Sequence, residues 1–251
     1  CLAAGADRHH IGLFMGGHGH GDEAHVVHVG LAEAADLFVI APATADIMAK
    51  LAHGLAGDLL TVTALASRCP LLIAPAMDGG MYSHPATQSN EKILRDRGIT
   101  FIDPAEGRMA SGLIGKGRMV EPSVLLDHIR YVLSRNGALK GKKVVVTAGG
   151  TQEDIDPVRF ISNHSSGKQG FAVAQAALDR GADVTLITAP TNQIAPHGVT
   201  RIDVRSAQEM GDAVLAAVAD ADVLVMAAAV ADFKPEASAD QKIKRGAITT
   251  Y

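Results

Sequence analysis

Short runs of apolar residues alternate with amphipathic segments along most of the chain. The first clear run, residues 37–43, ends in a Pro/Thr turn, and residues 45–56 after it have helical spacing. Residues 71–77 and 99–104 repeat the apolar pattern, with a helical segment at 86–97 between them. Strands that are buried on both faces have this continuous apolar character, and their alternation with helices is typical of a parallel sheet.

The same alternation resumes after a polar, Gly-containing segment at 137–142. Residues 123–134 before it have helical spacing, with Ser123 as the expected N-cap. Further elements are expected as a strand from Lys143, a helix at about 170–180, a strand at 183–188, a helix at 206–219 and a strand at 222–230. We therefore predict an α/β protein with two doubly wound parallel-sheet domains, 1–136 and 143–251, joined by a linker at 137–142. Ligands of such sheets bind beyond the carboxyl ends of the strands.

Composition narrows the possible functions. The length of 251 residues suits two cores better than one. The net charge of −4 and the lack of a Lys/Arg stripe argue against a nucleic-acid partner. The apolar run at 223–231 is too short to span a membrane, and no export signal is recognisable, so we expect no membrane partner. Two cysteines cannot build a disulfide framework, which favours a cytoplasmic protein.

The two ends of the sequence are unusual. The chain opens on Cys1 rather than Met, and its last residues, up to Tyr251, follow no closing helix pattern. We expect a fragment cut at both ends.

Generic motifs give little. Neither first strand is followed by GxGxxG, SSGKQG resembles a P-loop only superficially, and CxxC and HExxH are absent from the sequence. No metal ligands are therefore assigned to protein side chains. The histidines at 9, 10, 18, 20 and 25 lie in a glycine-rich stretch, where a flexible loop is favoured over a metal site.

Specific blocks of sequence identify a family. Residues 36–60, 71–82, 112–122, 147–170 and 228–245 together resemble the bifunctional phosphopantothenoylcysteine decarboxylase/phosphopantothenate–cysteine ligase family of coenzyme A biosynthesis. The resemblance covers roughly residues 25–245, with both halves in the family's order. It implies a flavodoxin-like flavoprotein domain, in which the first strand and phosphate loop are missing, followed by a Rossmann-like ligase domain that is missing its C-terminal part.

The resemblance also implies the chemistry. The ligase half would use CTP, with Mg²⁺, to turn the carboxylate of 4′-phosphopantothenate into an acyl-cytidylate, which the amine of cysteine attacks. The flavin half would use FMN to oxidise the thiol of the product, so that CO₂ is lost, and the reduced flavin would then return the electrons to give 4′-phosphopantetheine. The family further implies a homo-oligomer, with a trimeric flavin domain and a dimeric ligase domain.

Family positions on the flavin side map onto a few residues. His28 matches the catalytic histidine, although a half-buried structural histidine is the alternative. Thr44, Asp46, Pro75 and Met77 match positions near the flavin, but Thr44 and Asp46 would also suit the start of a helix.

Two catalytic positions depart from the family pattern. Asp78 stands where the family has a catalytic Asn, and an ionised Asp cannot donate a hydrogen bond to a carboxylate. Ser111 replaces the Cys that protonates the intermediate, and a hydroxyl is the weaker acid. Tyr82 occupies the family's aromatic position. These departures leave open a rearranged proton transfer, a slow decarboxylase, or a flavin domain kept for assembly.

On the ligase side, Asn163 and Lys242 match catalytic family residues that hold the acyl-cytidylate and neutralise the triphosphate. The expected CTP-binding residues are Gly149, Gly150, Ser166, Gly167, Lys168, Ala228, Ala229, Asp232 and Phe233. Without the resemblance, the glycine turn would fit an ordinary strand-to-helix turn equally well. The KIKR run at 242–245 would then be interpreted as a solvated charged segment rather than as part of a site.

Three other functions are alternatives. A non-catalytic flavoprotein-like interaction subunit is supported by Asp78 and Ser111. A decarboxylase acting on a peptide C-terminal cysteine is disfavoured by the ligase motifs from Thr147 onward. The missing glycine fingerprint disfavours an NAD dehydrogenase.

Overall fold

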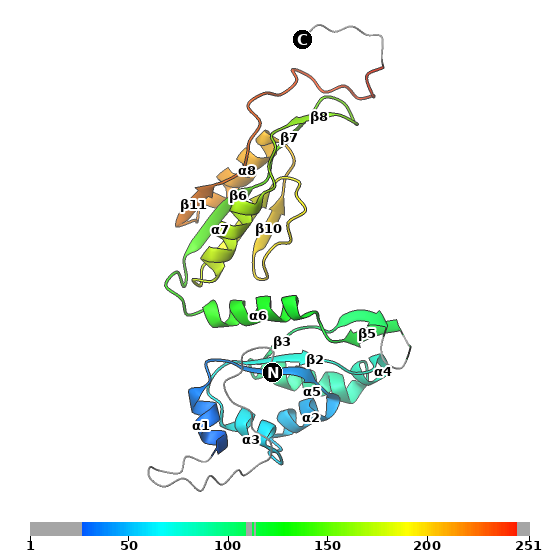
Figure 1. The fold of residues 1–251 in the computed structure, drawn as a ribbon, viewed down its shortest axis with the longest axis vertical. Coiled ribbons are helices and arrows are strands. Elements are labelled where there is room, and N and C mark those ends of the chain that lie inside the picture. The colour runs from blue at the N-terminus through cyan, green and yellow to red at the C-terminus, as the bar shows by residue number, and fades with distance from the viewer. Residues whose placement is uncertain (1–26, 109–111, 113, 245–251) are drawn as a thin grey trace. The chain divides into compact units, whose positions relative to one another are not determined.

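The chain divides into two compact units, Cys1–Val132 and Leu133–Tyr251 (Figure 1). The computed structural model describes residues 27–108, 112 and 114–244. Ser111 and the histidines at 9–25 lie outside the described residues. The α/β class with parallel sheets is confirmed, while the finer domain limits at 1–136, 137–142 and 143–251 remain a prediction.

The first unit is built on a three-stranded parallel sheet. Its strands are β1 (Phe38–Ala43), β2 (Leu71–Pro75) and β3 (Thr100–Phe101), paired in that order. The third strand is shorter than the predicted run at 99–104. The helices of this unit are α1 (Val27–Ala34), α2 (Ala45–His53), α3 (Leu59–Ala66), α4 (Gly79–Tyr82), α5 (Pro85–Asp96) and α6 (Pro122–Ser134), which ends in the second unit.

Apolar side chains cover both faces of this sheet. On one face, Ile40 and Ile73 pack with Met48 of α2 and Leu94 of α5. On the other face, Leu72 and Ala74 pack with Ile102 and Val120, and with Leu125 and Ile129 of α6. The continuous apolar runs of the sequence are therefore explained by helices on both sides of the strands (Figure 1).

The predicted N-cap of α6 is wrong. The helix begins at Pro122, so Ser123 lies inside its first turn. Proline suits the first helical position because its fixed φ is already helical and its missing N–H would have had no intrahelical acceptor there. The hairpin before α6, β4 (Ala105–Arg108) and β5 (Ile114–Arg118), is antiparallel.

The second unit has a four-stranded parallel sheet in the order β10-β9-β6-β11. Its strands are β6 (Lys143–Ala148), β9 (Asp183–Thr188), β10 (Thr200–Asp203) and β11 (Val223–Met226). Helices α7 (Lys168–Leu178) and α8 (Ala207–Val218) pack against the sheet, and β6 and β9 are its most buried strands. A small antiparallel hairpin, β7 (Gln152–Asp154) and β8 (Phe160–Ser162), follows β6.

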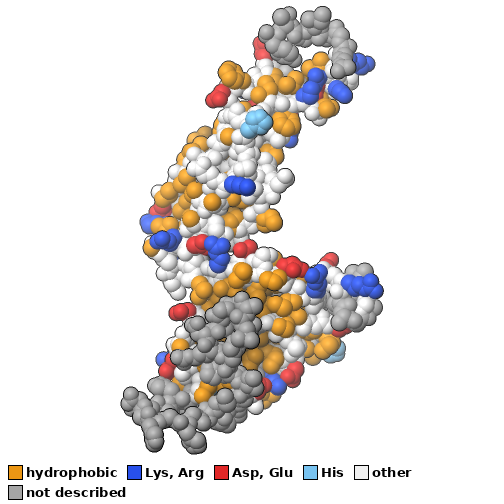
Figure 2. Space-filling model, viewed as in Figure 1, with side chains coloured by type: hydrophobic (Ala, Val, Ile, Leu, Met, Phe, Trp, Pro, Cys, Tyr) orange, Lys and Arg blue, Asp and Glu red, His pale blue; other side chains and the backbone are white. Residues whose placement is uncertain are grey.

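Strand β11 departs from the prediction that the strands are buried on both faces. Val223, Leu224 and Met226 are 45%, 41% and 60% exposed. Within the described residues β11 pairs only with β6, so it forms an edge of the sheet. Figure 2 shows that hydrophobic side chains reach the surface of both units.

Candidate functional site

In the first unit, the exits of β1 and β2 meet at one edge of the sheet. The N–H of Ala76 donates to the carbonyl of Ala43 at 2.9 Å, and the N–H of Met77 donates to the carbonyl of Gly117 at 3.0 Å. Pro75 is buried, and Met77 is half-buried against the core below. The exits of β1 and β2 and strand β5 of the β4–β5 hairpin are therefore joined by backbone hydrogen bonds.

His28 lies on α1, where its ring nitrogen Nδ1 is buried and has no hydrogen-bond partner among the described residues. A buried polar atom without a partner costs free energy, and Thr63 Oγ1 and Glu91 Oε2 are in the same position among the described residues. The catalytic role of His28 therefore stays a prediction, with which the unpartnered Nδ1 agrees.

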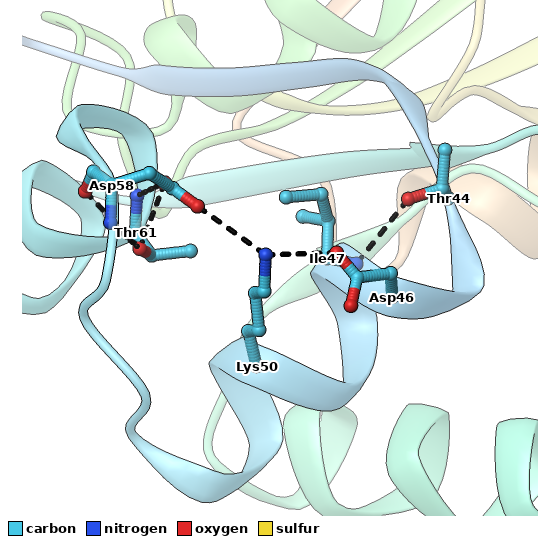
Figure 3. A network of polar contacts seen from close by, with 6 residues as sticks. All are labelled: Thr44, Asp46, Ile47, Lys50, Asp58 and Thr61. Carbon is cyan, nitrogen blue, oxygen red and sulfur yellow. Dashed lines mark hydrogen bonds and ion pairs between the residues drawn. The ribbon is translucent and has the colours of Figure 1, made fainter. Parts of the chain in front are cut away.

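Thr44 and Asp46 have structural roles at the start of α2 (Figure 3). Thr44 caps the helix, with Oγ1 accepting the N–H of Ile47 at 3.3 Å. Asp46 pairs with Lys50 at 2.9 Å, and this hydrogen bond raises the pKa of Lys50. The capping alternative therefore holds for Thr44, whereas Asp46 lies inside the first turn and stabilises the helix dipole.

Lys50 also reaches Asp58, the N-cap of α3, at 3.4 Å (Figure 3). Asp58 and Thr61 form a reciprocal capping box, in which Oδ1 of Asp58 accepts the N–H of Thr61 at 2.9 Å. The backbone and side-chain hydrogen bonds from Thr61 lower the pKa of the Asp58 carboxyl.

Replacing Asp58 with alanine is expected to lower the free energy of unfolding of this unit by about 1 kcal/mol at pH 7, because two capping bonds are lost. The folded pKa lies below the unfolded value, so this contribution is present above about pH 4 and disappears as the pH falls through the folded pKa. Urea unfolding at pH 7 measures the loss of free energy of unfolding, and the same experiment at pH 3 measures how much of it disappears. D96A, which removes an exposed i,i+4 pair with Lys92, is the control. An equal loss for both variants would contradict the capping role.

Asp78 is the N-cap of α4, and its Oδ1 accepts the N–H of Gly80 at 2.9 Å. Tyr82, at the end of this short helix, is buried. Burial, followed by the nearby charge of Glu91, raises the pKa of Tyr82 to about 12. Tyr82 is therefore a neutral phenol at physiological pH.

These residues fit the ring of a flavin better than its phosphate. The exits of β1 and β2 carry the small residues Ala43, Pro75 and Ala76, which a flat ring can approach closely, and the Nδ1 of His28 has no partner among the described residues. The first turn of α2 already carries the carboxylate of Asp46, which disfavours a phosphate at that helix end.

In the second unit, the glycine loop after β6 is hydrogen-bonded to the loop after β11. The N–H of Ala229 donates to the carbonyl of Gly149 at 2.8 Å, and the N–H of Thr151 donates to the carbonyl of Ala229 at 3.2 Å. Thr151 Oγ1 accepts the N–H of Ala231 at 2.9 Å. Two predicted binding segments, 149–151 and 228–233, are thus held side by side.

Two glycines are required by close approach of the backbone. A Cβ on Gly149, which has φ +81°, would lie 2.8 Å from the carbonyl oxygen of Ala189, and one on Gly150 would lie 2.8 Å from that of Asn163. Both substitutions would push these segments apart.

The start of α7 lies against the same loop. Gly167 precedes the helix with φ 72°, and a Cβ there would approach the backbone nitrogen of Gly149 at 3.5 Å. The carbonyl of Ser166 accepts the Thr191 hydroxyl at 3.0 Å, and Lys168 is exposed. Backbone N–H groups at a helix start favour an anion.

The segment after β8, which contains Asn163, contacts the loop after β11. The Nδ2 of Asn163 donates to the carbonyl of Val230 at 2.9 Å, in the loop after β11. Asp232 and Phe233 line a pocket with Glu153, whose Oε1 accepts the N–H of Ala207 at the start of α8 at 2.7 Å. Phe233 is 78% exposed.

Lys242 is exposed and lies in a segment docked on the β7–β8 turn. Of the predicted ligase residues, the structure brings together Gly149, Gly150, Asn163, Gly167 and the segment at 228–230. The hydrogen bonds that join these segments do not involve Lys242, so the catalytic role of Lys242 stays a prediction.

Two threonines that were not predicted from the sequence organise this site. Thr147 is fully buried, and its Oγ1 accepts the N–H groups of both Ala227 and Ala228 at 3.1 Å. Thr151 holds Ala231 in the same way. A threonine at the end of an otherwise apolar strand was the available signal, because a buried hydroxyl needs a partner.

Replacing Thr147 with valine keeps the shape but leaves two backbone N–H groups without their acceptor, so we expect the free energy of unfolding to fall by about 1–3 kcal/mol. Urea unfolding tests this. T188V is the matched control, because Thr188 is also fully buried but its hydroxyl makes one hydrogen bond, to Ala189. A larger loss for T188V than for T147V would contradict this role of Thr147.

No group of three or more His, Cys, Asp or Glu side chains among the described residues could hold a metal ion. Within the same part of the chain, no helix is long and apolar enough to cross a membrane.

Comparison with known proteins assigns each half of the chain. Residues 19–134 match the Flavoprotein family, and residues 139–250 match the family described as DNA/pantothenate metabolism flavoprotein C-terminal domain. The chain is 53% identical over 226 residues to the Coenzyme A biosynthesis bifunctional protein CoaBC of Mycobacterium bovis, covering 88% of this chain and 54% of that protein. The protein of the same name from Vibrio parahaemolyticus is 48% identical over 225 residues, covering 90% of this chain and 56% of that protein.

A crystal structure of the C-terminal domain of a CoaBC protein is 42% identical, covers 43% of this chain and 58% of that chain, and has a TM-score of 0.40. The chain spans about half the length of the curated relatives it matches. Both family matches and both relatives relate the chain to the same family. The chain therefore belongs to the family of the coenzyme A biosynthesis bifunctional proteins.

Proposed function

We propose that the full-length protein converts 4′-phosphopantothenate to 4′-phosphopantetheine in two steps, as an enzyme of the cytoplasm. The second unit ligates cysteine to 4′-phosphopantothenate with CTP, and the first unit decarboxylates the product with FMN. The near 50% identity to CoaBC proteins along both units supports this proposal. The observation that carries it is the joining of three segments, at 149–151, 163 and 228–231, around the exits of β6 and β11.

In the ligation step, a carboxylate oxygen of 4′-phosphopantothenate attacks the α-phosphorus of CTP and pyrophosphate leaves. The amine of cysteine then attacks the acyl carbon and CMP leaves. The backbone N–H groups at the start of α7 favour the phosphates, and the glycines let the backbone approach them closely.

Charge on the leaving pyrophosphate needs cations. Mg²⁺ bound to the triphosphate supplies one, and Lys168 and Lys242, both exposed, supply others. Asn163 would hold the acyl-cytidylate from the β8 side, while Asp232 and Phe233 would contact the nucleotide from the pocket after β11.

For the decarboxylation step, bound FMN would take two electrons from the substrate thiol and, after CO₂ has left, its reduced form would return them, so that the step is redox-neutral overall. His28, whose buried Nδ1 has no partner among the described residues, is proposed as the group that handles the proton in this step. Pro75 and Met77 would face the ring system from the exit of β2. Ser111 is proposed as the proton donor to the product, in place of the family's cysteine.

One observation favours a second function. The carboxylate of Asp78 accepts the N–H of Gly80, so in its ionised form it offers no donor to a substrate carboxylate. An interaction subunit with a flavin domain that is inactive as a decarboxylase is therefore the competing proposal. Both proposals are compatible with a homo-oligomer in which the flavin units form trimers and the ligase units dimers.

Adding phosphopantothenoylcysteine to the full-length protein separates these two functions. The flavin absorbance first establishes that FMN is bound, and the release of CO₂ is then followed. The proposed enzyme releases CO₂ stoichiometrically with substrate. Bound flavin without CO₂ would favour the interaction subunit.

A further inference from the structure

Asp156 is a buried carboxylate that neither proposed reaction uses. It lies in the turn between β7 and β8, and it is 1% exposed. Its Oδ1 accepts the N–H groups of Val158 and Arg159, each at 2.8 Å. Its Oδ2 accepts the guanidinium of Arg159 through Nε at 2.9 Å and also through Nη2. The carboxylate therefore fixes both the turn and the direction of the Arg159 side chain.

One more bond reaches far along the chain. The N–H of Ile243, 87 residues later, donates to Oδ2 of Asp156 at 3.1 Å. The Nη2 of Arg159 donates to the carbonyl of the same Ile243 at 3.1 Å. Asp156 and Arg159 together thus occupy both backbone polar groups of one residue, as a strand neighbour would.

A second attachment lies a few residues earlier. The N–H of Ala239 donates to the carbonyl of Ile155 at 2.9 Å. Residues 239–243, which we call the strap, are therefore attached to the β7–β8 turn at both ends. Lys242 lies inside the strap, next to the residue that Asp156 holds, and its side chain is exposed.

The hairpin under the strap connects directly to the candidate ligase site. At its base Gln152 pairs with Ser162, so β7 continues from Thr151 of the glycine loop and β8 continues into Asn163. The strap with Lys242, the glycine loop and Asn163 are therefore all attached to one small hairpin.

The charges on this turn show why the carboxylate matters. The hydrogen bonds from Arg159, followed by those from the backbone, hold the pKa of Asp156 well below its usual range. Its negative charge is shared between the guanidinium and three backbone N–H groups. An amide at this position would keep the shape but lose the charge and one of the two acceptor oxygens.

We propose that Asp156 is a positioning residue of the ligase reaction, which acts by holding the strap so that Lys242 is placed for the nucleotide step. The inference rests on the proposed function of the second unit. If Asp156 had a merely structural role, its replacement would change the KM values for CTP and for cysteine alike. A role through Lys242 would affect only the step in which the charge of CTP is neutralised.

The test compares D156N, K242Q and the double variant in the full-length protein. We expect D156N to raise KM for CTP about tenfold or more while KM for cysteine stays within about twofold. The double variant should be no worse than K242Q alone, because residues that act through one another are not additive. D154N is the matched control: Asp154 lies on the same hairpin but is exposed and pairs with Arg205 at 2.8 Å, so its KM for CTP should be unchanged.

Hydrogen exchange at the amide of Ile243 gives a readout that does not depend on activity. Faster exchange in D156N than in D154N is expected, because only D156N weakens the acceptor of that N–H. Equal exchange, equal KM values for CTP, or additive losses in the double variant would overturn the positioning role. If the unsubstituted protein fails to consume CTP, the proposed function fails instead, and the exchange experiment still decides whether Asp156 holds the strap.

Discussion

Replacing His28 with asparagine is expected to reduce CO₂ release from phosphopantothenoylcysteine by about 100-fold or more, the usual range for loss of a general acid or base. Asparagine keeps a polar side chain of similar size but cannot act as a general acid or base. The buried Nδ1 of His28, without a partner among the described residues, is the structural reason for expecting a role in proton handling.

The same variant carries an internal control. CTP-dependent ligation should stay at the unsubstituted rate, because His28 belongs to the first unit and the ligase segments belong to the second. H53N is the matched variant, since His53 is an exposed histidine in the last turn of α2. Comparable CO₂ release from H28N and H53N would contradict the proposed role of His28.

Replacing Asn163 with aspartate is expected to reduce CTP-dependent ligation by about 100-fold, which is typical for the loss of one donor from a preorganised site. The side-chain amide of Asn163 donates to the carbonyl of Val230 at 2.9 Å. A carboxylate in its place offers no donor and repels both that carbonyl and the phosphates of CTP. The β8 exit would then lose its contact with the loop after β11.

The rate of pyrophosphate release measures this effect. N136D is the control, because Asn136 is an exposed asparagine of the same unit whose Oδ1 only accepts a bond from Lys140. A loss in N163D no greater than that in N136D would remove Asn163 from the site. Decarboxylation of added phosphopantothenoylcysteine should be unaffected in both variants.

Local pattern in the sequence predicts most of the sheet. The apolar runs at 37–43, 71–77 and 183–188 all contain strands, because a strand buried on both faces has nowhere to put a polar side chain. The exposed strand β11 shows the limit of this reasoning. Its apolar run indicates a strand, but the same letters cannot tell a central strand from an edge.

The N-cap of one helix agrees with the sequence and that of another does not. Thr44 caps α2, which was one of the two roles expected for it. Ser123 does not cap α6, because Pro122 already starts that helix. Both residues are good caps in isolation. The neighbouring proline decides which residue is outside the helix, and its signal was present in the sequence.

The site residues that lie at strand ends could be predicted from the sequence, whereas those in irregular segments could not. The glycine loop and the loop after β11 lie at strand ends, so topology alone places them together. The contacts of Asp156 with Ile243 join residues 87 positions apart and depend on how two irregular segments fold onto each other. The Asp-Pro dipeptide at 156–157 indicates a turn but not what the turn would hold.

The most direct test of two cooperating sites uses the full-length protein, supplied with 4′-phosphopantothenate, cysteine and CTP in the presence of Mg²⁺ and FMN. The products are identified by mass spectrometry. We predict that 4′-phosphopantetheine accumulates with CMP and pyrophosphate, and that omitting cysteine stops the sequence at the acyl-cytidylate. A mixture in which CTP stays intact and neither phosphopantothenoylcysteine nor 4′-phosphopantetheine is formed would contradict the account.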